Sequence, residues 1–190
     1  YASTAYPAGT VNASYAISAG TDRMLVVAVA STRTTVGTQS VSVTYGTQAM
    51  TLAVGDATNA TNRNHTYIFY LNDAGIAAAS GDDLDVTITG GTSYYNFVYA
   101  AVFAGVDQST VYTDTRNYFS GATANNTVGP FSAGLTINEG DQAIEVINLA
   151  RSTAGGGVRT VTTWSNGTWP SPSSVAATYI PGTNWALGFH

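Results

Sequence analysis

Short apolar stretches with the two-residue period of β-strands follow one another along most of the chain. Residues 23–30 (RMLVVAVA) are almost entirely apolar, which is typical of a central strand buried on both faces. Residues 40–45 (SVSVTY) alternate between polar and apolar side chains, which predicts a strand with one face in water. Residues 65–71 (HTYIFYL) and 96–103 (NFVYAAVF) are rich in aromatic and β-branched side chains, and each is predicted to form another strand.

Glycine turns and polar loops separate the predicted strands. A turn at residues 46–48 leads into a predicted strand at 49–54, and residues 56–64 form a polar loop. One helical turn is expected near residues 76–79. The polar region 107–129 is longer than most β connections, which suggests a role in binding, assembly or the extension of a sheet edge. The remaining predicted strands cover residues 84–89, 131–137, 143–150, 158–164, 175–180 and 184–189.

These strands, about ten to twelve in number, predict an all-β fold: a two-layer antiparallel β-sandwich, jelly-roll-like. We see no linker or break in composition, so we expect a single domain spanning residues 1–190. The composition agrees, because the chain has 29 Thr, 18 Val and 12 Tyr but only seven Leu, two Glu and no Lys. The absence of cysteine excludes disulfides, thiolate metal sites and cysteine nucleophiles.

The charge pattern excludes two classes of partner. Only 9% of the residues are charged, the net charge is −5, and the six cations are all arginines scattered along the chain. Binding to nucleic acid or to an anionic membrane surface needs a basic stripe or cluster, which is lacking. The sequence contains no run of 18 apolar residues, so it predicts no transmembrane helix.

Low charge with many Thr, Ser, Asn and Gly residues favours an extracellular or cell-surface location. The chain begins at Tyr1 without a leader, as a processed or a trimmed chain would.

Several segments together resemble a β-sandwich module that recurs in secreted and surface proteins of bacteria. The resemblance implies a jelly-roll or lectin-like sandwich with a binding or structural role, and it offers no catalytic motif. It spans residues 20–190. The segments that carry it are 20–29 (GTDRMLVVAV), 43–51 (VTYGTQAMT), 70–71 (YL), 103–108 (FAGVDQ) and 184–188 (NWALG).

Residues suited to catalysis are few. The two histidines, His65 and His190, are far apart in the sequence, and no G-x-S-x-G motif accompanies them. Glu145 shares a strand face with apolar residues, so it is either an acid with a raised pKa or a carboxylate held by an arginine or exposed at an edge. The only other glutamate is Glu139, so a glycosidase pair is hard to assemble. We therefore predict that the protein is not an enzyme.

The densest acidic cluster consists of Asp82, Asp83 and Asp85. Together with Asp73, these carboxylates could supply the oxygen ligands of a calcium ion, although their spacing does not match an EF-hand loop. The alternative is a turn with solvated acids. Calcium is the only cofactor that the sequence allows us to consider.

Aromatic residues around a polar turn provide one candidate binding site. Trp164 and Trp169 flank Asn166, and flat aromatic rings can stack on sugars while an amide binds hydroxyl groups. This pattern is compatible with a carbohydrate-binding or adhesive module that takes a polysaccharide. The alternative is that these rings pack against the end of the sandwich.

The N-terminal segment provides a second candidate, for self-assembly. Residues 1–11 contain Tyr1, Tyr6 and Val11 and no charged side chain, so they could form an edge strand or a strand exchanged with a neighbouring subunit. Lysine on edge strands is a common protection against edge pairing, and this chain has none. We therefore favour a structural protein, a filament or appendage subunit that forms homo-oligomers through strand pairing.

Overall fold

The chain is described by a computed structural model, which covers residues 4–6, 10–33, 35–55, 64–91, 93–112, 114–115, 144–150, 174–180 and 183–189. These ranges contain twelve strands and one short helix, and the strands pair antiparallel. The prediction of an all-β fold is confirmed. The chain divides into two compact units, Tyr1–Val111 and Tyr112–His190, which are described separately below. The single domain over residues 1–190 stays a prediction.

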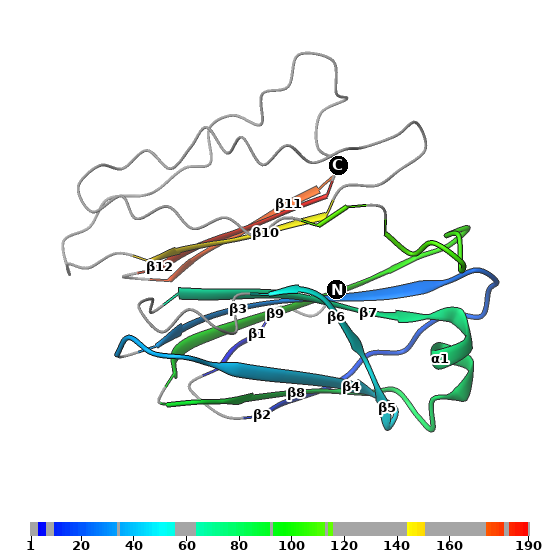
Figure 1. Ribbon diagram of the computed structural model, residues 1–190, viewed down its shortest axis with the longest axis horizontal. Coiled ribbons are helices and arrows are strands. Elements are labelled where there is room, and N and C mark those ends of the chain that lie inside the picture. The colour runs from blue at the N-terminus through cyan, green and yellow to red at the C-terminus, as the bar shows by residue number, and fades with distance from the viewer. Residues whose placement is uncertain are drawn as a thin grey trace, which may run out of the picture. The chain divides into compact units, whose positions relative to one another are not determined.

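The first unit contains a five-stranded sheet in the order β1-β9-β3-β7-β6. Its central strand β3 is buried along nearly its whole length on both faces, as the apolar run at residues 23–30 predicts. In Figure 1 this sheet lies above the second sheet of the unit. The bounds of its strands are Thr4–Tyr6 (β1), Ser93–Phe103 (β9), Met24–Arg33 (β3), Asn64–Asn72 (β7) and Thr51–Gly55 (β6).

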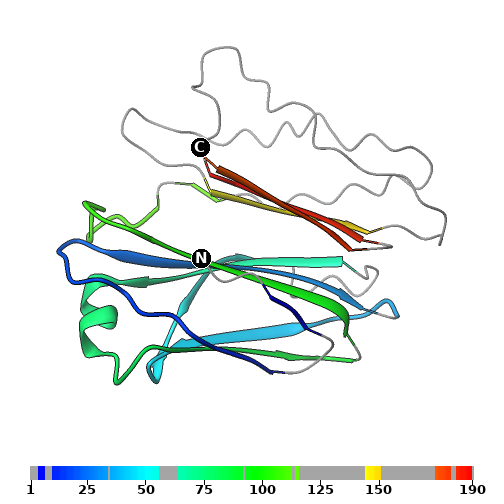
Figure 2. The same cartoon turned by 180° about the vertical axis from the view of Figure 1, so that it is seen from behind.

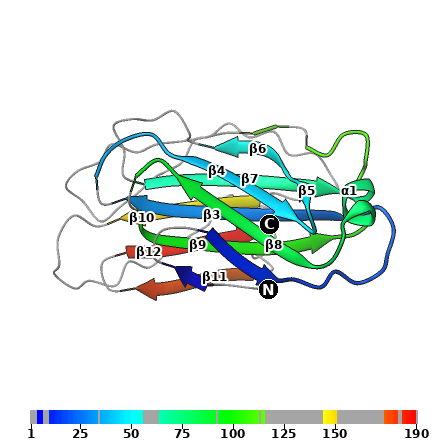
Figure 3. The same ribbon diagram turned by 90° about the horizontal axis from the view of Figure 1, so that it is seen from below.

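The second sheet of this unit has four strands in the order β2-β8-β4-β5. Its strands run obliquely to those of the first sheet, and the helix α1 (Asp73–Ala78) lies at one end of the unit (Figures 2 and 3). Strand β4 has the bounds predicted from its alternating pattern. The strands are Thr10–Ser14 (β2), Asp83–Thr89 (β8), Ser40–Tyr45 (β4) and Gln48–Ala49 (β5).

The core of the first unit draws on both of these sheets. Alternate residues in the apolar parts of β3, β7 and β9 belong to the same buried cluster as alternate residues of β4 and β8. A strand places alternate side chains on one face, so this periodicity brings the apolar residues of the two sheets together. The cluster includes Leu25, Val27, Val29, Tyr67, Phe69, Val98, Val43, Tyr45, Leu84 and Val86.

The predicted strand at residues 49–54 is wrong, because the structure divides it between the two sheets. Gly46 and Thr47 both have positive φ angles and form the two-residue turn that joins β4 to β5. After Ala49 the chain leaves this sheet at the buried Met50, and Thr51 begins β6 in the five-stranded sheet. Periodicity alone does not reveal such a crossing, since both halves have strand-forming residues.

The second unit contains a three-stranded antiparallel sheet in the order β10-β12-β11. The strands are Ile144–Ala150 (β10), Ser174–Ile180 (β11) and Thr183–Phe189 (β12), close to the predicted ranges. Strand β12 pairs along its whole length with both neighbours. The predicted strands at residues 131–137 and 158–164 lie outside the described residues. Nowhere in the described ranges is there a helix long and apolar enough to cross a membrane.

Candidate functional site

The N-terminal segment supplies an edge strand to each sheet of the first unit. Within the described part of the chain, strand β1 pairs with β9 alone, with Thr4 opposite Val98 and Tyr6 opposite Asn96. Strand β2 has β8 as its one partner among the described strands, with Val11 opposite Val86. Figure 3 shows β2, in dark blue, beside β8. The N-terminal segment therefore forms one edge of each sheet among the described strands.

Val11 anchors this segment in the hydrophobic core. Its side chain is only 3% exposed and belongs to the cluster that joins the two sheets. Thr10 and Asn12, on either side of it, are exposed, as expected for a strand with one face in water. Of the three residues singled out for assembly, Val11 is thus buried in its own chain. Tyr6 lies in β1, and Tyr1 lies outside the described residues.

Two carboxylates of the acidic cluster hold β2 in place. The Nδ2 of Asn12 donates to Oδ1 of Asp85, and Oγ of Ser14 donates to Oδ2 of Asp82 over 2.7 Å. Asp83 lies opposite Ser14 in the strand register. Within the described part of the chain, no three His, Asp or Glu residues are grouped in a way that could hold a metal ion. Calcium binding by these aspartates stays a prediction.

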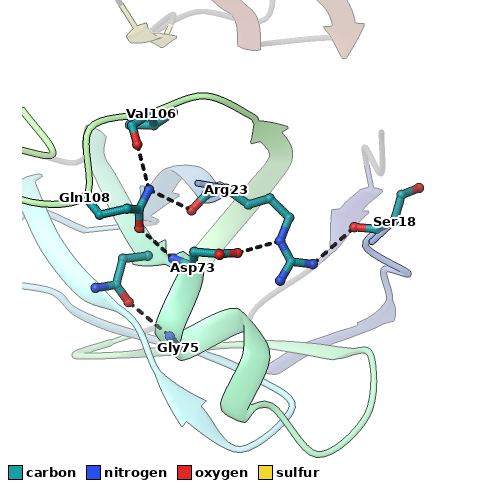
Figure 4. A network of polar contacts seen from close by, with 7 residues as sticks. Ser18, Arg23, Asp73, Gly75, Val106 and Gln108 are labelled. Carbon is teal, nitrogen blue, oxygen red and sulfur yellow. Dashed lines mark hydrogen bonds and ion pairs between the residues drawn. The ribbon is translucent and has the colours of Figure 1, made fainter. Parts of the chain in front are cut away.

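A polar network ties together the end of the first unit that contains α1 (Figure 4). Nε of Arg23 lies 2.5 Å from Oδ1 of Asp73, and Nη1 of Arg23 donates to the Ser18 carbonyl over 3.1 Å. The side chain of Gln108 accepts a hydrogen bond from the Asp73 backbone N–H and donates to the carbonyls of Arg23 and Val106. The Arg23 guanidinium beside Asp73 lowers the pKa of that carboxyl below its ordinary value.

This network connects segments that carry the resemblance to surface β-sandwich modules. Arg23 lies in residues 20–29 and Gln108 in residues 103–108, and both meet the start of α1. The side chain of Asn72 caps this helix by accepting a hydrogen bond from the Gly75 N–H over 3.0 Å. No sequence pattern identified Arg23, Asp73 and Gln108 as a group. An Asn followed by an Asp is a helix-start signal that could have drawn attention to them.

A row of buried polar residues crosses the five-stranded sheet near the other end of β3. Ser31 lies opposite His65 on β7 and opposite Asn96 on β9. Oγ of Ser31 donates to Oδ1 of Asn96 over 2.6 Å and accepts from Nε2 of Gln39 over 2.8 Å. Ser31 and His65 are 0% exposed, so a substrate could reach the hydroxyl only if the core opened.

The aromatic candidate site, one glutamate and one histidine lie beyond what the structure describes. Trp164, Asn166 and Trp169 fall in the undescribed stretch 151–173, and Glu139 and His190 are also outside the described residues. Glu145 lies in β10, opposite Gly188 of β12. The carbohydrate-binding site at these residues therefore stays a prediction.

Comparisons with known proteins found no relative of this chain. No family model, no curated protein and no solved structure matches this chain. A function is therefore inferred from the geometry of the chain itself.

Proposed function

We propose that the protein is an extracellular structural protein, a self-associating filament or appendage subunit that assembles through β-strand contacts. The observation that carries this proposal is the position of the N-terminal segment. Among the described strands it forms the edge of both sheets of the first unit, with one strand pairing in each. A terminal segment of this kind can leave its own subunit and make the same pairings in a neighbour.

The strand order supports a jelly-roll-like β-sandwich for the first unit. Strands β1-β9-β3-β7 of one sheet face β2-β8-β4-β5 of the other, so the chain alternates between the sheets from β1 to β4 and again from β7 to β9. Strands from distant parts of the sequence are interleaved in each sheet, as two Greek keys require. In this order, the N-terminal segment can be removed without breaking any pairing between the other strands.

Exchange would transfer both polar and apolar contacts to the neighbouring subunit. Val11 would enter the core of the neighbour at the place that it occupies in its own chain, and Asn12 would meet the neighbour's copy of Asp85. Residues 15–23 connect β2 to β3 and would act as the hinge. Fully extended, these nine residues span about 30 Å, which gives the segment room to reach a second subunit.

The direct test is removal of residues 1–14. We expect the intact chain to form large ordered particles in size-exclusion chromatography and negative-stain electron microscopy, and the truncated chain to lose them. A synthetic peptide of residues 1–14 should bind the truncated chain and restore its thermal stability. The same peptide with Val11→Asp is the matched control and should not restore it. Normal assembly of the truncated chain would show that the proposal is wrong.

A further inference from the structure

The connection between β2 and β3 is held against the first unit at both of its ends. At its start, the Tyr15 N–H donates to the Asp82 carbonyl over 2.8 Å, and the side chains of Tyr15 and Ile17 pack against the core cluster. At its end, the Asp22 carbonyl accepts a hydrogen bond over 2.9 Å from a backbone N–H just after β9. Residues 18–22, which we call the hinge loop, are all exposed. The hinge loop is therefore the part of the connection that can open without disturbing the core.

Arg23 holds the hinge loop in a folded shape (Figure 4). Its Nη1 donates to the Ser18 carbonyl over 3.1 Å, which ties the first residue of the loop to the residue that follows the last. Gly20, in the middle of the loop, lies beside the aliphatic part of Arg23, since a Cβ atom on Gly20 would be 3.4 Å from Cδ of Arg23. Fully extended, these five residues span about 17 Å, so an extended loop could keep neither contact.

Asp73 fixes the guanidinium in the position that this contact needs. Its Oδ1 lies 2.5 Å from Nε of Arg23, and the Arg23 side chain is only 14% exposed. Gln108 binds both the Asp73 N–H and the Arg23 carbonyl. All three residues belong to parts of the chain that stay in the subunit when the N-terminal segment leaves. The ion pair would therefore survive strand exchange, whereas the bond to Ser18 would not.

Asp22, the last residue of the hinge loop, has a strained backbone. Its φ angle is 53°, in the left-handed region that residues with a Cβ atom rarely adopt. In an extended loop this residue would return to a negative φ angle, and the strain would be released. The folded loop therefore contains one contact that keeps it closed and one strained residue that opposes closure.

We propose that the hinge loop is the switch that sets how readily the N-terminal segment leaves its own subunit. This inference rests on the strand exchange proposed above for assembly. The bond between Arg23 and Ser18 favours the closed subunit, in which the segment pairs with its own chain. The strain at Asp22 favours the exchanged form, because short connections under strain promote exchange between subunits. Single substitutions should therefore shift the balance in either direction.

Native-state hydrogen exchange in the dilute intact chain measures the opening of the N-terminal segment without assembly. The amides of β2 report this opening, and those of β3 report global unfolding as an internal reference. Arg23→Lys keeps a cation beside Asp73 but has no second nitrogen for the Ser18 carbonyl. Exchange in residues 10–14 should therefore become about tenfold faster. Asp22→Gly should make it about fivefold slower, because glycine adopts a positive φ angle without strain.

Thr21→Gly is the matched control for the glycine variant. It places a glycine in the same loop, but Thr21 does not have a positive φ angle, so exchange in β2 should not become slower. Equal slowing by Thr21→Gly and Asp22→Gly would show that strain at Asp22 is not involved. If Arg23→Lys fails to fold, the comparison of these two glycine variants still decides the proposal.

The same variants in an assembly assay separate this inference from the proposed function. The monomer concentration in equilibrium with assembled particles, measured by size-exclusion chromatography, should fall about tenfold in Arg23→Lys and rise about fivefold in Asp22→Gly. Unchanged exchange of β2 in both variants, relative to β3, would overturn the switch. Altered exchange of β2 without assembly of any variant would support the switch and show that the proposed assembly is wrong.

Discussion

Asn12 and Asp85 join the N-terminal edge strand to the strand beside it through their side chains as well as their backbones. Their Cα atoms are direct partners in the β2–β8 register, and the Asn12 amide donates to the Asp85 carboxylate. Both side chains lie on the outer face of the sheet, opposite the face on which Val11 enters the core. Whatever releases this strand must break both the polar and the apolar contact.

Asn12→Ala tests the polar contact. A hydrogen bond to a charged group at a partly exposed site contributes about 1 kcal/mol, so we expect a loss of about this size in the free energy of unfolding. Amide hydrogen exchange in residues 10–14 should become faster. Thr10→Ala is the matched control, because Thr10 is exposed on the same strand and face. Equal exchange in the two variants would show that the amide does not hold β2.

Val11→Ala tests the apolar contact. The substitution removes two buried methyl groups from the core and leaves part of their space unfilled. We expect the free energy of unfolding to fall by about 2 kcal/mol, measured by chemical denaturation with an unchanged m-value. A change below about 0.5 kcal/mol, the range of ordinary surface substitutions, would mean that Val11 does not anchor the segment.

The ion pair of Arg23 and Asp73 predicts a pH dependence of stability. The folded-state pKa of Asp73 lies below its ordinary value of 3.8, so the unfolded chain binds a proton at this site before the folded chain does. The stabilisation is therefore complete above about pH 5 and is lost as the pH falls through the folded-state pKa.

Asp73→Asn should lower Tm at pH 7 and flatten the fall of Tm between about pH 5 and pH 2. Tm is measured by circular dichroism across this range. Asp83→Asn, at an exposed position of β8, is the matched control. If the two variants show the same pH profile, the ion pair does not contribute as described.

The local structure of several strands could be predicted from the sequence, whereas the contacts between strands could not. The alternation at residues 40–45 predicts the bounds of β4, and the apolar run at 23–30 predicts a strand buried on both faces. Both predictions depend only on residues that are neighbours in the sequence. The segment 49–54, predicted as one strand, instead crosses between the two sheets at Met50. This crossing depends on which strand each half of the segment pairs with.

The candidate sites depend on pairing between distant residues, which no local pattern contains. Arg23 and Asp73 meet across fifty positions of the chain. Ser31 and Asn96 meet because β3 lies between β7 and β9. The acidic residues Asp82 and Asp85 attract attention in the sequence as a cluster, but the structure uses each for a separate bond to β2. Such residues can be picked out from the sequence, but their partners follow only from the register of the paired strands.

The carbohydrate alternative makes a prediction of its own. If Trp164, Asn166 and Trp169 bind polysaccharide, Trp169→Ala should weaken retention in affinity electrophoresis by about tenfold, through the loss of ring stacking on a sugar. Trp185→Phe, in β12, is a control that keeps an aromatic ring. Unchanged retention of Trp169→Ala would remove this site from consideration.

Exchange of the N-terminal segment between subunits can be tested by locking the segment reversibly onto its own chain. The chain has no cysteine, so Asn12→Cys combined with Asp85→Cys provides a single possible disulfide between directly opposed residues. The protein is oxidised as a dilute monomer and then concentrated, with light scattering and electron microscopy as readouts. We predict that the oxidised protein stays monomeric and that the reduced protein assembles. The same state of association under both conditions would contradict strand exchange.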